Sequence, residues 1–187
     1  SDVFSVAESD PGLIISVSEA LAALRAGALP ATQVIDTEEL RGVISAATAP
    51  MEDLCGAIIP RTYDQWYDGG APIITLDQAP VISVASVSEV AGRVRRTLTE
   101  QPLDAGTYDA WGYTVDLQLG TVTRRSSGIQ LAFSPGRQNV HVIYTAGRKV
   151  LPANILRATR RLVRWLYQTE INGVVMPAPG GGMTVTP

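Results

Sequence analysis

The chain has 187 residues, of which 45% are hydrophobic, and this length suits one compact domain with tails. The net charge of −3 and the pI near 5.1 exclude a protein that binds nucleic acid over its whole surface, because neutralisation of the phosphates needs an excess of Lys and Arg. Cys55 is the only cysteine, which excludes an internal disulfide and a cysteine-rich zinc site. No apolar run approaches the ~18 residues of a membrane span, and no signal-peptide pattern is found, so we expect a soluble protein made in the cytoplasm.

Residues 1–35 are expected to form an N-terminal extension that contains one short helix. Ser18 is followed by a run rich in Ala and Leu, which stops near Gly27 and Pro30. A serine before such a run is a favourable N-cap, so the pattern predicts that Ser18 begins the helix.

A second helix is indicated by hydrophobic residues that recur every three or four positions from Leu40 to Ile58. Asp36 and Glu39, three residues apart, form an acidic relative of the capping box and mark its start. Pro50 lies inside the stripe, where it lacks a backbone donor and clashes with the preceding turn. We therefore expect either a kinked helix or two abutting helices.

Between Pro60 and Gly147 the sequence is typical of an antiparallel sheet of hairpins, because short runs rich in Val, Ile, Thr and Tyr alternate with Gly, Pro, Asp and Ser. Residues 100–112 predict a longer loop. The fold class is therefore α+β. The expected strands are 61–66, 72–76, 81–90, 94–99, 113–119, 121–125, 128–133 and 139–145.

Pro152 begins the last and best-defined helix, which is predicted to be long and to end at Asn172-Gly173. At ~100° per residue, four arginines fall within an arc of about 100°, opposite its apolar residues. Three interpretations are open: a solvated face with carboxylates nearby, an interface with an acidic neighbouring subunit, or a surface facing passing DNA. The arginines are Arg157, Arg160, Arg161 and Arg164.

No catalytic set is apparent. His141, the only histidine, lies in a strand pattern, which favours a hydrogen-bonded structural role over catalysis. Cys55 lies beside an apolar helix face and is read as a small core residue. Nothing in the sequence selects a pair of carboxylates, and the glycine run 180–182 lacks the helix and Lys-Ser/Thr of a phosphate loop. We expect no enzymatic activity, no metal site and no cofactor.

Aromatic residues gather in two places, after the second helix and near the long loop. They favour packing or interface anchoring. The alternative is a β-rich carbohydrate- or receptor-binding module, in which an exposed platform would consist of Trp66, Tyr67, Trp111 and Tyr113.

Three short motifs follow one another along the chain in an order that resembles a known family. Leu76-x-x-x-Pro80-Val81-x-Ser83-Val84 is followed by Val142-x-Tyr144-x-Ala146-Gly147, then by Pro152-x-x-Ile155-x-x-Ala158 and by the aromatic pair Trp165 and Tyr167. In this order the motifs resemble the head-tail connector (adaptor) family of tailed bacteriophages. The resemblance covers residues 36–173, which would form the connector (adaptor) domain.

The resemblance implies a structural virion protein that forms a ring, a dodecamer, between portal and tail, joining head to tail and extending the DNA channel. Its implied partners are further copies of the chain, the portal, a stopper or tail-completion protein and passing double-stranded DNA, with no membrane. Assembly would take place in the host cytoplasm, and the final location would be the head-tail interface of the virion. A related alternative is another joint component, such as a stopper or tail-completion protein.

Residues 174–187 form a Gly/Pro-rich tail that is expected to be flexible when unbound. Its short apolar segments could gain order by adding to a sheet edge or a groove on the portal. The residues predicted to dock there are Val174, Val175, Met176, Met183 and Val185.

Overall fold

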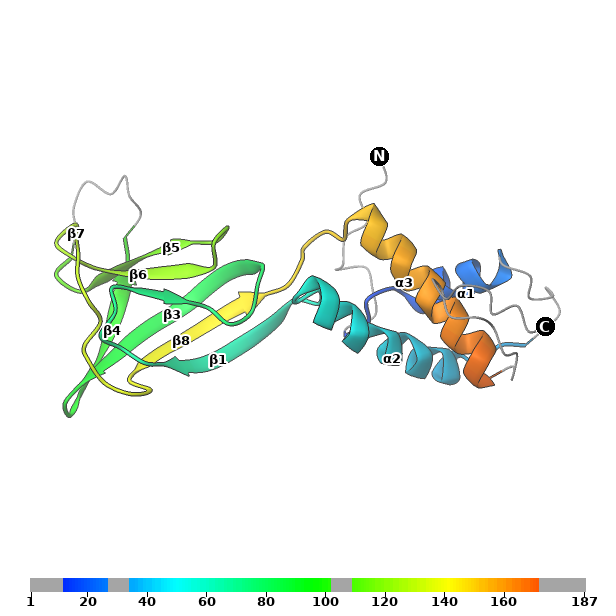
Figure 1. Cartoon of the computed structure of the whole chain (residues 1–187), viewed down its shortest axis with the longest axis horizontal. Helices are drawn as coiled ribbons and strands as arrows, with labels where there is room; N and C mark the ends of the chain where they lie inside the picture. Colours follow the sequence, from blue (N-terminus) through cyan, green and yellow to red (C-terminus); the bar gives the residue numbers. More distant parts are fainter. Residues whose placement is uncertain (1–11, 27–33, 102–108, 172–187) are drawn as a thin grey trace, which may run out of the picture. The chain divides into compact units, whose positions relative to one another are not determined.

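A computed structural model of the chain describes residues 12–26, 34–101 and 109–171 (Figure 1). The contacts divide the chain into a helical unit, to which residues up to Ile59 and from Lys149 onward belong, and a sheet unit, Pro60–Arg148. Three helices and an eight-stranded sheet confirm the α+β class. The division into two units differs from the single compact domain that the length suggested, because the residues of each unit contact mainly one another.

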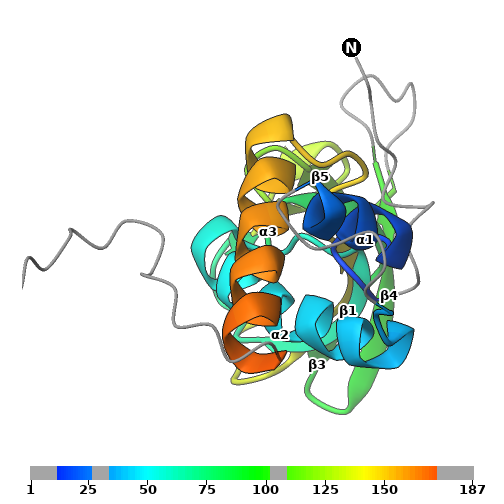
Figure 2. The same ribbon diagram turned by 90° about the vertical axis from the view of Figure 1, so that its right-hand side faces the viewer.

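The helical unit contains α1 (Val17–Arg25), α2 (Thr37–Cys55) and α3 (Ala153–Leu166), and a π-helical turn, η2 (Tyr167–Ile171), extends the last helix. Figure 2 looks onto this unit and shows the three helices side by side. Their apolar faces share one core, in which α1 is included, so the predicted N-terminal extension contributes to the packing. The limits 36 and 173 for a connector domain stay a prediction. The buried core residues are Ile14, Ile15, Ala20, Leu24, Leu40, Val43, Ile44, Ala47, Met51, Ile58, Leu151, Ile155, Leu156, Val163 and Tyr167.

Side-chain caps begin the first two helices. Ser16, and not Ser18, caps α1: its hydroxyl accepts the Glu19 N–H at 3.2 Å, while the Glu19 carboxylate accepts the Ser16 N–H at 3.4 Å. The predicted cap was therefore wrong by two residues, because the reciprocal partner Glu19 lies three positions after Ser16. Asp36 caps α2 as predicted and accepts the Glu38 N–H at 2.9 Å.

Helix α2 continues through Pro50 as one element, so of the two alternatives the pair of abutting helices is wrong, and the kinked helix stays a prediction. The proline removes a single backbone hydrogen bond, to the carbonyl of Ala46. Pro50 and Ala46 are both exposed, so water can take the place of the lost donor. The buried side of α2, from Leu40 to Met51, stays continuous and holds the helix together.

The sheet unit contains eight strands close to the predicted positions, and they form one sheet in the order β1-β8-β3-β4-β5-β6-β2, with β7 beside β6. All pairings are antiparallel except β4 with β5, which run parallel over two residue pairs. Strand β5 ends earlier than predicted, because the Asp116 carboxylate accepts the N–H groups of Gln118 and Leu119 and turns the chain. The strands are β1 (Arg61–Tyr67), β2 (Ile73–Thr75), β3 (Val81–Ala91), β4 (Val94–Glu100), β5 (Gly112–Asp116), β6 (Thr121–Ser126), β7 (Ile129–Gln130) and β8 (Val140–Ala146).

Candidate functional site

The four predicted arginines of α3 differ in exposure. Arg157 and Arg161 are exposed, whereas Arg160 and Arg164 are half-buried. The opposite side of α3 is apolar as predicted, with Ile155 buried in the core of the unit. The helix therefore presents a basic face to solvent, centred on two of the four residues.

Arg160 belongs to the helical unit itself. Its guanidinium donates to the Glu19 carboxylate on α1 at 2.8 Å, and both side chains are partly buried. A cavity of about 500 Å³ lies beside this pair, lined by Ala22 and Ala23 of α1 and by Ala26, which caps the end of that helix. The ion pair therefore joins α1 to α3, and the role predicted for the four arginines as a group stays a prediction.

The remaining predicted site, the C-terminal tail, lies outside the described residues, as do Asn172 and Gly173. Its proposed docking residues Val174, Val175, Met176, Met183 and Val185 stay a prediction.

The aromatic residues do not form one exposed platform. Tyr113 is buried, and the guanidinium of Arg96 lies over the Trp111 ring, 4.1 Å from its centroid. Trp66 is half-exposed, but its ring packs against the ring of His141 at a centroid distance of 4.5 Å. The predicted platform of four exposed aromatic residues is therefore wrong for Tyr113, whereas Trp66 and Trp111 stay partly exposed beside their ring and cation–π partners.

His141 is a buried, hydrogen-bonded residue of β8, as predicted. Its Nε2 lies 2.5 Å from the Asp64 carboxylate of β1, and its Nδ1 lies 2.6 Å from the Arg95 guanidinium of β4. A guanidinium can only donate, so Nδ1 accepts and the ring proton is on Nε2, which donates to Asp64. The histidine thus ties three strands of the sheet together.

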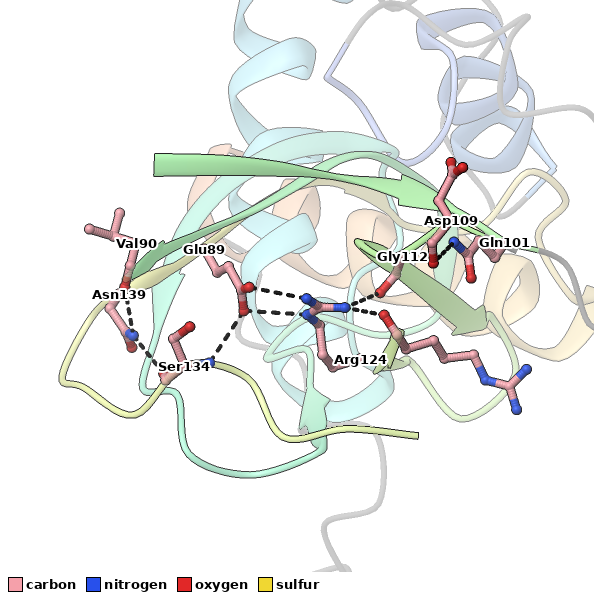
Figure 3. Close-up of polar contacts among 9 residues, drawn as sticks. Glu89, Val90, Gln101, Asp109, Gly112, Arg124, Ser134 and Asn139 are labelled. Carbon is pink, nitrogen blue, oxygen red and sulfur yellow. Dashed lines mark hydrogen bonds and ion pairs between the residues drawn. The ribbon is translucent and has the colours of Figure 1, made fainter. Parts of the chain in front are cut away.

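A second polar cluster is fully enclosed in the sheet unit (Figure 3). The Arg124 guanidinium of β6 meets the Glu89 carboxylate of β3 through Nη2 at 3.2 Å and Nε at 3.4 Å. The side chains are only 1% and 2% exposed. Two buried charges are tolerated because they pair and because their remaining donors and acceptors are used. Arg124 Nη1 donates to the carbonyls of Gly112 and Arg125, and Glu89 accepts the Ser134 N–H at 3.2 Å.

Asn139 completes this cluster. Its amide nitrogen donates to the carbonyls of Ser134 at 2.7 Å and Val90 at 3.2 Å, and its amide oxygen accepts the Gly69 N–H at 2.9 Å. The loop that contains Ser134 is thereby held to β3, as Figure 3 shows. The cluster has a structural role, because its buried amide and charged groups form hydrogen bonds with one another and with the backbone.

Sequence analysis missed the pair formed by Glu89 and Arg124. The sequence did indicate that both side chains face the core. Arg124 lies two residues after the buried Val122, and Glu89 lies two residues after the buried Val87, so each points to the same side of its strand as a core residue. Opposite charges at core-facing positions of two strands indicate an internal ion pair.

Among the described residues, no group of three His, Cys, Asp or Glu side chains is placed to hold a metal ion. Within the same part of the chain, no helix is both long and apolar enough to cross a membrane. Cys55 is partly buried against the helical core, in agreement with its predicted packing role.

Comparison with known proteins finds solved structures that share this fold. A chain from the neck of an empty gene transfer agent particle, computed with C6 symmetry, is 23% identical, with a TM-score of 0.63, over 97% of this chain and 91% of that chain. A chain from the virion of the native particle is 22% identical, with a TM-score of 0.64, over the same shares. A chain from the native neck, computed with C12 symmetry, is 20% identical, with a TM-score of 0.58, over 97% and 90%.

At these identities the likeness shows a common fold. The match spans nearly the whole of both chains, so it includes the helical unit and the sheet unit together. No protein-family model matches the sequence, and no curated protein matches it.

Proposed function

We propose that the chain is a structural subunit of the neck of a phage-like particle, where copies of it form a ring between portal and tail, join head to tail and extend the DNA channel. The observation that carries this proposal is the fold shared with neck chains over 97% of the sequence. The motif order that resembles connector (adaptor) proteins supports the same function independently, because it was recognised from the residues alone.

The charge distribution supports a role around a DNA channel. With a net charge of −3 the subunit would not retain DNA strongly, since strong non-specific binding needs many cationic contacts with phosphates. A ring of twelve copies is proposed because the similar native neck was computed with C12 symmetry and the connector family is expected to form dodecamers.

The experiment is microscopy of particles from a strain that produces the chain with a tag. Label at the junction between head and tail is expected, and deletion of the chain should leave heads and tails unjoined. Label on the capsid shell or on the tail fibres would contradict the proposal. The position relative to the portal also separates an adaptor from a stopper or tail-completion protein.

The C-terminal tail is proposed to dock on the portal. Deletion of residues 174–187 should reduce attachment of the chain to purified portal rings, while the helical and sheet units keep their fold by circular dichroism. Unchanged attachment would contradict docking by the tail and would leave the neck assignment intact.

A further inference from the structure

We infer that the sheet unit contains a pH-sensitive switch, in which protonation of the His141 ring releases the guanidinium of Arg95 into solvent. The residues of the switch lie on four neighbouring strands, β1, β8, β3 and β4. The inference concerns the sheet unit by itself, so it does not depend on the proposed ring.

The side chain of Arg95 lies across the face of the sheet that carries His141. Trp66 of β1 and Ser88 of β3 are the register partners of His141 on β8, so the three side chains point to the same face. From β4, the guanidinium of Arg95 donates through Nε to the Ser88 hydroxyl at 3.1 Å and through Nη2 to His141 Nδ1 at 2.6 Å. It also lies 5.4 Å from the centroid of the Trp66 ring. One flexible side chain therefore connects β4 with three other strands.

These contacts cover His141 but leave Arg95 free to move. His141 is 8% exposed, and the Trp66 ring packs against it at a centroid distance of 4.5 Å. Arg95 is an exposed residue. Its guanidinium can therefore move into water by side-chain rotation, without a change in the backbone of β4.

The hydrogen bonds of the imidazole ring require its neutral form. Nδ1 accepts from Arg95, and Nε2 donates to the Asp64 carboxylate. A charged imidazolium carries a proton on each nitrogen and can only donate. A proton taken up from solvent would therefore bind Nδ1, where it would meet an Arg95 N–H group, donor against donor. Repulsion between the two cations acts in the same direction, so the charged ring cannot keep Arg95 in place.

The charges around the ring are arranged so that the two states differ in one contact. Asp64 of β1 attracts a charged ring, and Arg95 of β4 repels it. The residue that β3 places against the ring, Ser88, is neutral, while the neighbouring Glu89 points to the other face of that strand. Once Arg95 has moved away, the imidazolium keeps its bond to Asp64. The released state therefore carries one more positive charge on this face, together with a free guanidinium.

Histidine is the side chain whose charge changes in mildly acidic solution, so a nuclear magnetic resonance titration between about pH 8 and pH 5 tests the switch. His141 is the only histidine, and its ring signals report on this site alone. The Arg95 Nε–H signal is assigned by its loss in Arg95→Lys. It should change with the same midpoint as the ring signals, because the two events are one equilibrium.

Proton exchange with water gives the size of the effect. Release of Arg95 ends the hydrogen bond from Nε to Ser88, so exchange of the Nε proton should become about ten-fold faster or more. The rate is taken relative to that of Arg93, an exposed arginine of the same hairpin, because this ratio removes the direct effect of pH on exchange.

Two variants of His141 hold the switch in opposite states. His141→Gln has an amide that accepts from Arg95 and donates to Asp64 but takes up no proton, so slow exchange should persist at every pH. His141→Phe removes the acceptor, so exchange should be fast at every pH. Arg93→Gln is the matched control: it removes a positive charge from the same hairpin and should leave the coupling between the ring and Arg95 unchanged.

Three results would overturn the inference. They are a ring that stays neutral until the protein unfolds, a ring that titrates while the Arg95 signal does not change, and an Arg95 signal that changes with pH in His141→Gln as it does in the wild type. The neck assignment is unaffected by these results, because label position in particles tests it separately.

Discussion

Glu89 on β3 and Arg124 on β6 form a two-pronged ion pair inside the sheet unit, although β4 and β5 separate their strands in the sheet. The pair therefore links two parts of the sheet that no backbone ladder joins directly. Removal of one partner leaves the other charge buried without compensation, so Arg124→Met should lower the free energy of unfolding by about 3–5 kcal/mol. Urea denaturation followed by tryptophan fluorescence measures this.

The double variant Glu89→Met with Arg124→Met is the control for that prediction. It removes both charges, so it should be more stable than Arg124→Met alone, because no uncompensated charge remains. If the single and double variants were equally stable, the loss would come from side-chain packing and not from the pairing of charges.

His141→Phe should destabilise the sheet unit by about 1–2 kcal/mol. The substitution keeps an aromatic ring beside Trp66 but removes the hydrogen bonds to Asp64 and Arg95. Denaturation measures the loss, and the near-ultraviolet circular dichroism of Trp66 should be retained because the ring contact persists. A variant as stable as the wild type would show that the two hydrogen bonds contribute nothing to the net stability.

Tyr67 should make the sheet unit less stable in alkaline solution. Burial raises the pKa of its phenol, and the hydrogen bond with Tyr144 raises that pKa further. The folded state therefore holds its proton at pH values where the unfolded chain, with a tyrosine pKa of about 10, has released it. The stabilisation is complete below pH 10 and is lost progressively as the pH rises above it.

The measurement is the free energy of unfolding of wild type and Tyr67→Phe at several pH values between 8 and 12. The variant should show a shallower decline above pH 10. Some decline should remain, because burial also raises the pKa of Tyr113 in the sheet unit. Identical declines in the two proteins would contradict the assigned burial of the phenol.

Two glycine substitutions should act in opposite directions. Gly42→Ala should stabilise the helical unit by about 0.5–1 kcal/mol, since Gly42 lies inside α2 with open space around it. Gly69→Ala should destabilise the sheet unit, because a Cβ there would collide with the Ser134 carbonyl oxygen and lie 2.8 Å from Asn139 Oδ1. Thermal unfolding of both variants checks the pair, and an increase in melting temperature for Gly69→Ala would contradict the close packing around Asn139.

The local elements could be read from the sequence, because local patterns decide them. Hydrophobic steps of three and four predicted α2 and α3, and alternation between turn residues predicted the strands of the sheet. The structural role of His141 also followed from its strand pattern. The prediction that Ser18 caps the first helix was wrong because Ser16 and Ser18 are both possible caps. The reciprocal hydrogen bonds between Ser16 and Glu19 distinguish them in the structure.

Relations between distant residues were decided by tertiary structure alone. A pairing such as Glu89 with Arg124, or Glu19 with Arg160, depends on where whole elements pack, and local periodicity carries no information about that. The same holds for the division into two units. The helical core is built from residues that come before and after the sheet unit in the sequence, and local periodicity does not reveal that these two segments pack together. The sequence by itself determined the elements and their order, and the burial of their faces against one another decided which charges became internal and which stayed exposed.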